Sequence, residues 1–271
     1  MPSGTAPETT DILSPVRHRA EVVSNRQVAT DTWWLELDSP EIADRAEWGQ
    51  FVMIGFGLDH LAPPFLPRPF SVGWRCEDGR IGLLVRAFGA GSRRRAALRA
   101  GERVLLLGPL GRPFRLEPGV RVACVAGGVG LAPFLFLAGD ARCQGFDVDL
   151  LYGELTADKV FDVGLIEELT GRPPIVWTED GSLGRRGRVT DGLSTDGPVT
   201  VLACGPMPML QALAGRAARE GLDLQVSVEE HMGCGVGTCQ GCVVQGADGR
   251  WRKVCTQGAV FYASELKWPP S

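Results

Sequence analysis

Residues 120–133 read VRVACVAGGVGLAP, a stretch that predicts a buried strand, a glycine turn and the beginning of a helix. Val120 to Ala126 is an apolar run of strand length, and Pro133 opens a helix-length segment. A glycine turn between a strand and a helix lets the phosphates of a dinucleotide meet the helix N-terminus. Because the spacing is not the common G-x-G-x-x-G, it predicts an α/β unit but leaves the ligand open. The glycines concerned are Gly127, Gly128 and Gly130.

Downstream, apolar strands alternate with helix-length segments, which predicts a doubly wound parallel sheet and a NAD(H)-binding domain over residues 117–225. The expected strands are 120–126, 148–152, 174–178 and 199–203, and the expected helices are 133–143, 161–170 and 207–220. Cys204-Gly205-Pro206 follows the last strand, at the strand ends where open α/β sheets bind ligands. Cys204 itself fits either a buried structural cysteine or a residue beside a nicotinamide.

Upstream, short β-type runs separated by turn signals predict a small antiparallel barrel over residues 12–116. The expected strands are 18–24, 32–37, 51–56, 70–74, 81–87 and 103–107, and one helix is expected over 92–98. Residues 1–11 are polar and are expected to be disordered.

Two barrel segments are candidate anion-binding motifs. Arg68-Pro69-Phe70-Ser71 opens a strand, and Val85-Arg86-Ala87 leads into Phe88-Gly89-Ala90-Gly91-Ser92 at a helix start. Such a turn offers backbone N–H groups and a positive helix end to a pyrophosphate. Arg68 and Arg86 could add charge-assisted hydrogen bonds, although solvated surface arginines remain the alternative.

The tail over residues 226–271 is rich in glycine and cysteine, with two short strands expected. Cys234, Cys239, Cys242 and Cys255 follow the pattern C-x4-C-x2-C-x12-C. The opening C-x4-C-x2-C is the spacing of plant-type [2Fe–2S] ferredoxins. A four-cysteine zinc site is the alternative, but zinc sites usually present two separated cysteine pairs.

Composition excludes several classes of protein. The chain has 271 residues, 44% of them hydrophobic, and a net charge of -4, which gives no reason to expect a nucleic acid or an anionic membrane as partner. The longest uncharged run, Val122 to Gly139, is interrupted by glycines and Pro133, so no membrane span is expected. No secretory signal is recognised, so we expect a cytoplasmic protein.

Taken in order, these motifs resemble the ferredoxin-NADP reductase superfamily, and more narrowly the electron-transfer subunits of class 1B dihydroorotate dehydrogenase. The resemblance runs from about Ile12 to Tyr262. It is carried by RPFS at 68–71, GAGS at 89–92, GPLG at 108–111, GGVGLAP at 127–133, ACGPMPML at 203–210 and the cysteine-rich tail from 229 to 255.

The resemblance implies a site for each cofactor. FAD would contact Arg68, Pro69, Phe70 and Ser71, be lined by Val85, Arg86 and Ala87, and place its pyrophosphate at Gly91 and Ser92. NAD(H) would be framed by residues 127–130 and by Cys204, Gly205 and Pro206, and the four tail cysteines would ligate the [2Fe–2S] cluster. Val85 departs from the family, which often has an aromatic residue there. Glu154, after the second parallel strand, would repel a 2′-phosphate and so favours NADH.

The implied function is transfer of electrons from NADH through FAD and the cluster to a partner subunit, in which hydride transfer requires no side-chain acid or base. We therefore assign no catalytic residue. In the family the partner is an FMN-containing dihydroorotate dehydrogenase of pyrimidine biosynthesis, in a heterotetramer with two copies of each subunit. The alternatives are a reductase subunit that feeds a hydrogenase, a glutamate-synthase-like flavoprotein or an oxygenase, and a noncatalytic zinc-binding scaffold.

Overall fold

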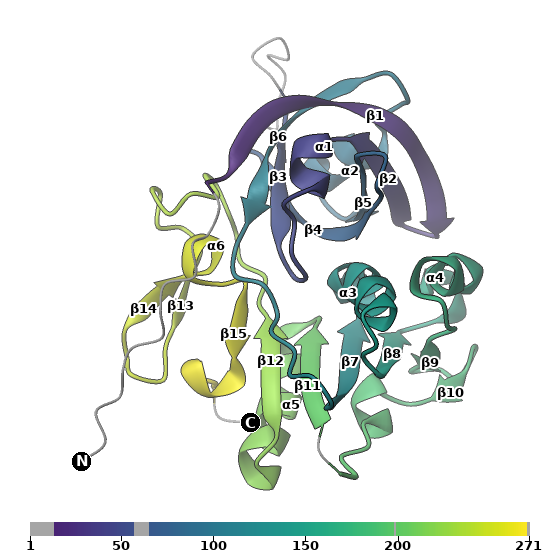
Figure 1. Cartoon of the computed structure of the whole chain (residues 1–271), viewed down its shortest axis with the longest axis vertical. Coiled ribbons are helices and arrows are strands. Elements are labelled where there is room, and N and C mark those ends of the chain that lie inside the picture. The colour runs from purple at the N-terminus through teal and green to yellow at the C-terminus, as the bar shows by residue number, and fades with distance from the viewer. Residues whose placement is uncertain (1–13, 57–64, 198, 270–271) are drawn as a thin grey trace.

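A computed structural model of the chain describes residues 14–56, 65–197 and 199–269. Figure 1 shows a barrel at the top, an open sheet below it, and the C-terminal strands and loops to one side of both. The disorder expected for residues 1–11 lies outside the described residues.

The N-terminal part is a closed antiparallel barrel with the strand order β1-β2-β5-β4-β3-β6. Its strands are β1 (Val16–Ala29), β2 (Thr32–Asp38), β3 (Phe51–Gly55), β4 (Arg68–Arg75), β5 (Arg80–Arg86) and β6 (Arg103–Leu110), with α1 (Pro40–Ala43) and α2 (Ala90–Ala96) between strands. The long β1 closes the barrel, because it pairs with β2 at one end and with β6 at the other. The predicted barrel is therefore confirmed, with α2 in place of the helix expected at 92–98.

The second part is a seven-stranded sheet with the order β10-β9-β8-β7-β11-β12-β15. Its strands are β7 (Arg121–Gly127), β8 (Val148–Glu154), β9 (Ile175–Thr178), β10 (Arg185–Arg186), β11 (Val199–Cys204), β12 (Asp223–Ser227) and β15 (Val260–Tyr262). Its helices are α3 (Ala132–Cys143), α4 (Val163–Thr170) and α5 (Met207–Glu220), with short 3-10 turns η1 (Gly128–Leu131), η2 (Ala157–Lys159) and η3 (Val189–Gly192). All pairings are parallel except β12 with β15, which confirms the doubly wound sheet.

The C-terminal tail contributes to two sheets. The tail holds more than the two short strands that were expected, because it contains the hairpin β13 (Val243–Gln245) and β14 (Trp251–Lys253) and also β15. The strands β12 and β15 were not predicted. One precedes and the other follows the cysteine loop in the sequence, and together they extend one edge of the nucleotide sheet. The proposed domain boundary between residues 225 and 226 thus falls inside β12. The tail also includes α6 (Val254–Gln257) and the turn η4 (Ala263–Glu265).

Shared apolar packing fixes the barrel, the sheet and the cysteine loop relative to one another. Helix α3 packs on barrel strand β4 and also on β8 of the sheet. One hydrophobic cluster includes Met53 of the barrel, Val201 of the sheet and the buried Cys255 of the tail. Each Å² of apolar surface removed from water contributes about 25 cal/mol, so these shared cores stabilise the contacts between the parts.

Candidate functional site

The two predicted nucleotide motifs meet at the C-terminal ends of β7 and β11, which are neighbouring parallel strands. A Cβ atom at Gly130 would overlap the carbonyl oxygen of Cys204 and lie 2.7 Å from the nitrogen of Gly205. A Cβ at Gly127 would lie 2.8 Å from Cδ of Pro206. The turns therefore pack backbone against backbone, which only glycine permits. The structure brings the two motifs together, as the sequence predicted.

Cys204 presents only its main chain to this junction. Its side chain is 1% exposed. Burial and, after it, the charge of Glu229 raise the pKa of the Cys204 thiol, so it stays protonated. Of the two possibilities left open by the sequence, this environment fits a structural cysteine.

The motif Arg68–Ser71 lies at the start of β4, paired with β3 of the barrel. Nη1 of Arg68 donates to the carbonyl oxygens of Leu66 and Pro67, each at 3.1 Å. A Cβ at Gly91 would lie 3.0 Å from Nε of Arg68. The barrel thus places Arg68 beside the Gly-x-Gly-Ser turn, although about twenty residues separate the two motifs in the sequence.

Two further arginines, which the sequence analysis missed, lie at the same place. Arg94 and Arg95 stack on the ring of Phe56, at 3.7 and 4.8 Å from its centroid. Burial and, after it, the charges of Arg68 and Arg94 lower the pKa of Arg95 to about 10. Arg95 is itself buried, and its Nη1 donates to the carbonyl oxygen of Gly91 at 2.8 Å, so it holds the glycine turn and adds positive charge behind it. The run Arg93-Arg94-Arg95 directly after the glycine turn was the available signal.

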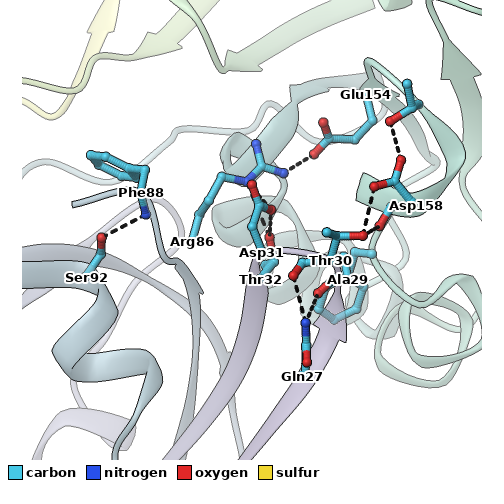
Figure 2. A network of polar contacts seen from close by, with 12 residues as sticks. Gln27, Ala29, Thr30, Asp31, Thr32, Arg86, Phe88, Ser92, Glu154 and Asp158 are labelled. Atoms are coloured by element: carbon cyan, nitrogen blue, oxygen red, sulfur yellow. Dashed lines mark hydrogen bonds and ion pairs between the residues drawn. The ribbon is translucent and has the colours of Figure 1, made fainter. Parts of the chain in front are cut away.

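Ser92 stabilises the turn itself. Its Oγ accepts a hydrogen bond from the backbone nitrogen of Phe88 at 3.2 Å (Figure 2) and another from that of Gly89 at 3.0 Å. The same hydroxyl donates to the carbonyl oxygen of Gly89 at 3.2 Å. The hydroxyl therefore serves the local fold, and the contact of Gly91 and Ser92 with the FAD pyrophosphate remains a prediction.

The three residues expected to line the flavin lie at the end of strand β5, and their side chains have different surroundings. Val85 is 0% exposed and packs in the barrel core. Because successive strand residues point to opposite faces, Arg86 points out of the barrel. A flavin could reach Val85 only through its main chain, which makes the missing aromatic at this position less important than the sequence suggested. Ala87 packs at the edge of the same core.

Arg86 and Glu154 form an ion pair between β5 and β8. Burial by itself lowers the pKa of Arg86, but the charge and hydrogen bond of Glu154 and the charge of Asp31 outweigh burial and raise the pKa. The Glu154 side chain is 3% exposed. The sequence analysis expected Glu154 to repel a coenzyme 2′-phosphate, whereas in the structure its carboxylate is paired with Arg86.

The four predicted cluster cysteines lie on the loop before β13 and at the start of α6. Gly235 and Gly237 have φ of 76° and 77°, in the left-handed region that glycine adopts readily. The backbone nitrogens of Val236 and Cys239 donate to Sγ of Cys234, both at 3.4 Å. Burial by itself raises the pKa of Cys234, but these N–H donors outweigh it and lower the pKa to about 7. The loop thus favours a thiolate, the form that binds iron.

The thiols lie in two pairs. Cys239 lies close enough to Cys234, and Cys242 close enough to Cys255, to shift the pKa of its neighbour. Burial and, after it, the hydrogen bond with Cys242 raise the pKa of Cys255 to about 12. Within the described residues, no three side chains of the metal-ligating types gather tightly enough to hold a single ion.

The cysteine loop packs directly on the barrel. A Cβ at Gly235 would lie 2.7 Å from Cγ of Met53 and 3.1 Å from Cδ1 of Leu110. Met53 is the register partner of Pro69, in the Arg68–Ser71 motif. A single strand, β3, therefore lies between the predicted cluster loop and the predicted flavin motif.

Comparisons with known proteins agree with this arrangement. Residues 229–267 match the family described as the iron-sulfur cluster binding domain of dihydroorotate dehydrogenase B. A protein of Geobacillus thermodenitrificans named dihydroorotate dehydrogenase B (NAD(+)), electron transfer subunit, is 38% identical over 92% of this chain and 98% of its own length. One of Methanopyrus kandleri, named a probable subunit of the same kind, is 37% identical over 92% and 91%.

The chain belongs to the family of dihydroorotate dehydrogenase B electron transfer subunits. The family fold agrees with solved structures. An NADH-dependent reduced ferredoxin-NADP oxidoreductase superposes with a TM-score of 0.81 at 27% identity, covering 92% of this chain and 90% of that one. The ferredoxin reductase of carbazole 1,9a-dioxygenase shares the fold with a TM-score of 0.66 at 24% identity, over 77% and 67%.

As a dihydroorotate dehydrogenase B electron transfer subunit, the chain is an oxidoreductase subunit that uses FAD, an iron–sulfur cluster and NAD(H). This confirms the expected activity class and cofactors, and the iron–sulfur match argues against the zinc scaffold. No helix among the described residues is long and apolar enough to span a bilayer.

Proposed function

We propose that this subunit passes electrons from NADH to an FMN-containing dihydroorotate dehydrogenase subunit in the cytoplasm. The observation that carries the proposal is the packing of the cysteine loop on β3, next to the Arg68–Ser71 motif. That packing gives electrons a short path from the flavin site to the cysteine loop. The family names support the partner and the coenzyme.

Each part of the chain has a separate task. Arg68 and Arg95 supply positive charge for the FAD pyrophosphate, and the main chain around Gly130 and Cys204 receives the coenzyme. Cys234, Cys239, Cys242 and Cys255 hold the [2Fe–2S] cluster. When bound, FAD accepts a hydride from NADH and the cluster carries single electrons.

Residues of the chain also protect the site. Cys242 and Cys255 are buried, each 1% exposed, so solvent reaches this thiol pair poorly. Cys239 is exposed and Cys234 partly exposed. This difference gives the cysteine loop one side facing the protein and one side facing outward, and we propose that the outward side meets the partner. The four cysteines outside this loop, Cys76, Cys124, Cys143 and Cys204, form no disulfide bond, which supports a reducing compartment such as the cytoplasm.

The proposal is tested with the chain purified without oxygen, followed by flavin and iron analysis and titration with NADH. We expect bound FAD, two irons per chain and bleaching of the visible spectrum by NADH. The chain is then mixed with an FMN-containing dihydroorotate-oxidising subunit, and NADH formation from dihydroorotate and NAD⁺ is followed at two subunits of each kind. A flavoprotein that NADH reduces, but that gives no coupled NADH formation, would favour a different electron acceptor.

A further inference from the structure

A polar network joins the barrel to the nucleotide sheet at the ends of β5 and β8 (Figure 2). Nη2 of Arg86 donates to Oε1 of Glu154. Nε of Arg86 lies 3.3 Å from Oδ1 of Asp31 and 3.3 Å from Oγ1 of Thr32, both at the beginning of β2. One guanidinium therefore contacts the flavin-side strands and the nucleotide sheet at the same time.

Glu154 is anchored on the sheet side. The hydroxyl of Tyr152 donates to Oε1 of Glu154 at 3.3 Å, and the backbone nitrogen of Phe161 donates to that hydroxyl at 3.2 Å. Tyr152 and Phe161 are each 1% exposed, so this support belongs to the core of the nucleotide domain. A carboxylate that is 3% exposed is strongly destabilising without its cation, which favours keeping the pair closed.

The same guanidinium lies against the nucleotide-binding turn. Gly128 has φ of 59°, and a Cβ there would lie 3.0 Å from Nη1 of Arg86 and 3.7 Å from Oε1 of Glu154. The turn that would receive the coenzyme, the strand that would line the flavin and the ion pair thus share one contact region. Moving the pair would shift the turn relative to the flavin site.

We propose that Arg86 is a positioning residue whose pair with Glu154 fixes the turn 127–130 relative to β5 and so sets how the nicotinamide approaches the flavin. This role replaces the pyrophosphate contact expected from the sequence. It also means that Glu154 does not read the coenzyme 2′-position, because its carboxylate is paired with Arg86. The inference rests on the proposed function, in which a hydride passes between these two groups.

The test compares the wild-type chain, loaded with its cofactors, with the variants R86Q and E154Q and with the double variant. Flavin bleaching by NADH and by NADPH is followed by anaerobic stopped-flow, with FAD and iron content measured on the same samples. A displaced reacting pair costs about 100-fold for a shift of 1 Å, so we expect the limiting rate to fall about 10- to 100-fold in each single variant. FAD and iron content should stay at the wild-type level, and the apparent NADH dissociation constant should change little.

Two features separate positioning from other roles. Because both variants break one contact, the double variant should be no slower than the slower single variant. Both coenzymes should slow by the same factor in E154Q. R86K, which keeps the charge but not the forked donor, should recover part of the rate lost in R86Q.

The matched control is T30V. Oγ1 of Thr30 donates to Oδ2 of Asp158 at 2.8 Å, which links the same two parts of the protein next to Arg86 without contacting it. The same hydroxyl also lies 2.9 Å from the carbonyl oxygen of Asp158, and losing both exposed contacts should leave the transfer rate within about twofold of wild type. An equal fall in T30V would overturn the proposal, because general loosening of the two domains would then explain the variants.

Three other results would overturn the inference while the proposed function stands. If R86Q is purified without bound FAD, Arg86 binds the FAD pyrophosphate instead. If E154Q is reduced faster than wild type by NADPH but not by NADH, Glu154 selects between the two coenzymes. E154Q reduced at the wild-type rate would show that the pair positions nothing. If NADH fails to reduce the wild-type protein, the proposed function itself is wrong.

Discussion

Replacing Gly130 with alanine tests whether the two nucleotide motifs pack as tightly as the structure shows. The added Cβ would overlap the carbonyl oxygen of Cys204 and lie 2.7 Å from the nitrogen of Gly205. Overpacking costs about 1–3 kcal/mol, and we expect the upper end because main-chain atoms cannot rotate away as a flexible side chain can. At roughly 2–4 °C per kcal/mol for a large domain, the melting temperature should fall by about 6–12 °C.

The assay is thermal unfolding followed by circular dichroism, with NADH binding measured on the same protein. Each 1.4 kcal/mol by which the added Cβ disfavours the NADH-bound state more than the free state should weaken NADH binding about tenfold. The control is G215A, in the middle of α5, where the new Cβ would lie 3.5 Å from the flexible Nη1 of Arg219. The same chemical change should there stabilise the helix by about 0.5–1 kcal/mol. If G130A melts like wild type and binds NADH equally well, the proposed backbone contact does not exist.

Three further predictions follow from the site. C255S should abolish the iron signal while FAD content stays near wild type, as iron and flavin analysis would show, and a variant that keeps two irons would contradict the ligand assignment. R95L should lower FAD content and leave iron unchanged, because the buried guanidinium contributes charge to the pyrophosphate site, and full flavin occupancy would contradict that role. Removing iron with a chelator should leave the flavin reducible by NADH but stop electron transfer to a partner subunit or dye that accepts only from the cluster, and continued transfer would place the exit at the flavin.

The elements with strong local signals were predictable from the sequence. Helix α5 begins and ends where the sequence placed it, at Met207 and Glu220. Pro206 precedes it, and Gly221 ends it in the left-handed conformation with φ of 69°. These signals depend on neighbouring residues alone, so they can be recognised without the fold.

The strand β15 had no such signal. Val260–Tyr262 is three residues long, and its pairing with β12 is made across the whole cysteine loop. The alternation that identifies a strand needs at least four to eight residues to be visible. The sequence therefore indicated a separate tail, whereas the tail returns to complete the edge of the nucleotide sheet.

Within the site, the close packing of the glycine turns could be predicted from the sequence, whereas the partners of the charged side chains could not, and the reason is physical. A glycine turn is recognisable because its backbone conformation and close approach exclude other residues, as at Gly130 against Cys204. An arginine gives no comparable local sign, because its partner is whichever carboxylate the fold brings within reach. The sequence assigned Arg86 to a phosphate, and the fold supplied Glu154 from 68 residues away.

In the proposed role, the ion pair of Arg86 with Glu154 holds two parts of the protein at a fixed distance. A surface ion pair contributes at most about 1 kcal/mol, but a pair with one partner 3% exposed resists separation because an unpaired buried charge is strongly unfavourable. That resistance is useful only where two rigid parts must keep one distance. In the proposed function the barrel and the sheet are such parts, since each would hold one of the two groups between which the hydride passes. A Cβ at Gly128 would lie 3.0 Å from Nη1 of Arg86, so the ion pair joins the turn that we expect to receive the coenzyme to strand β5 of the barrel, and in the proposed role it limits rotation of one against the other.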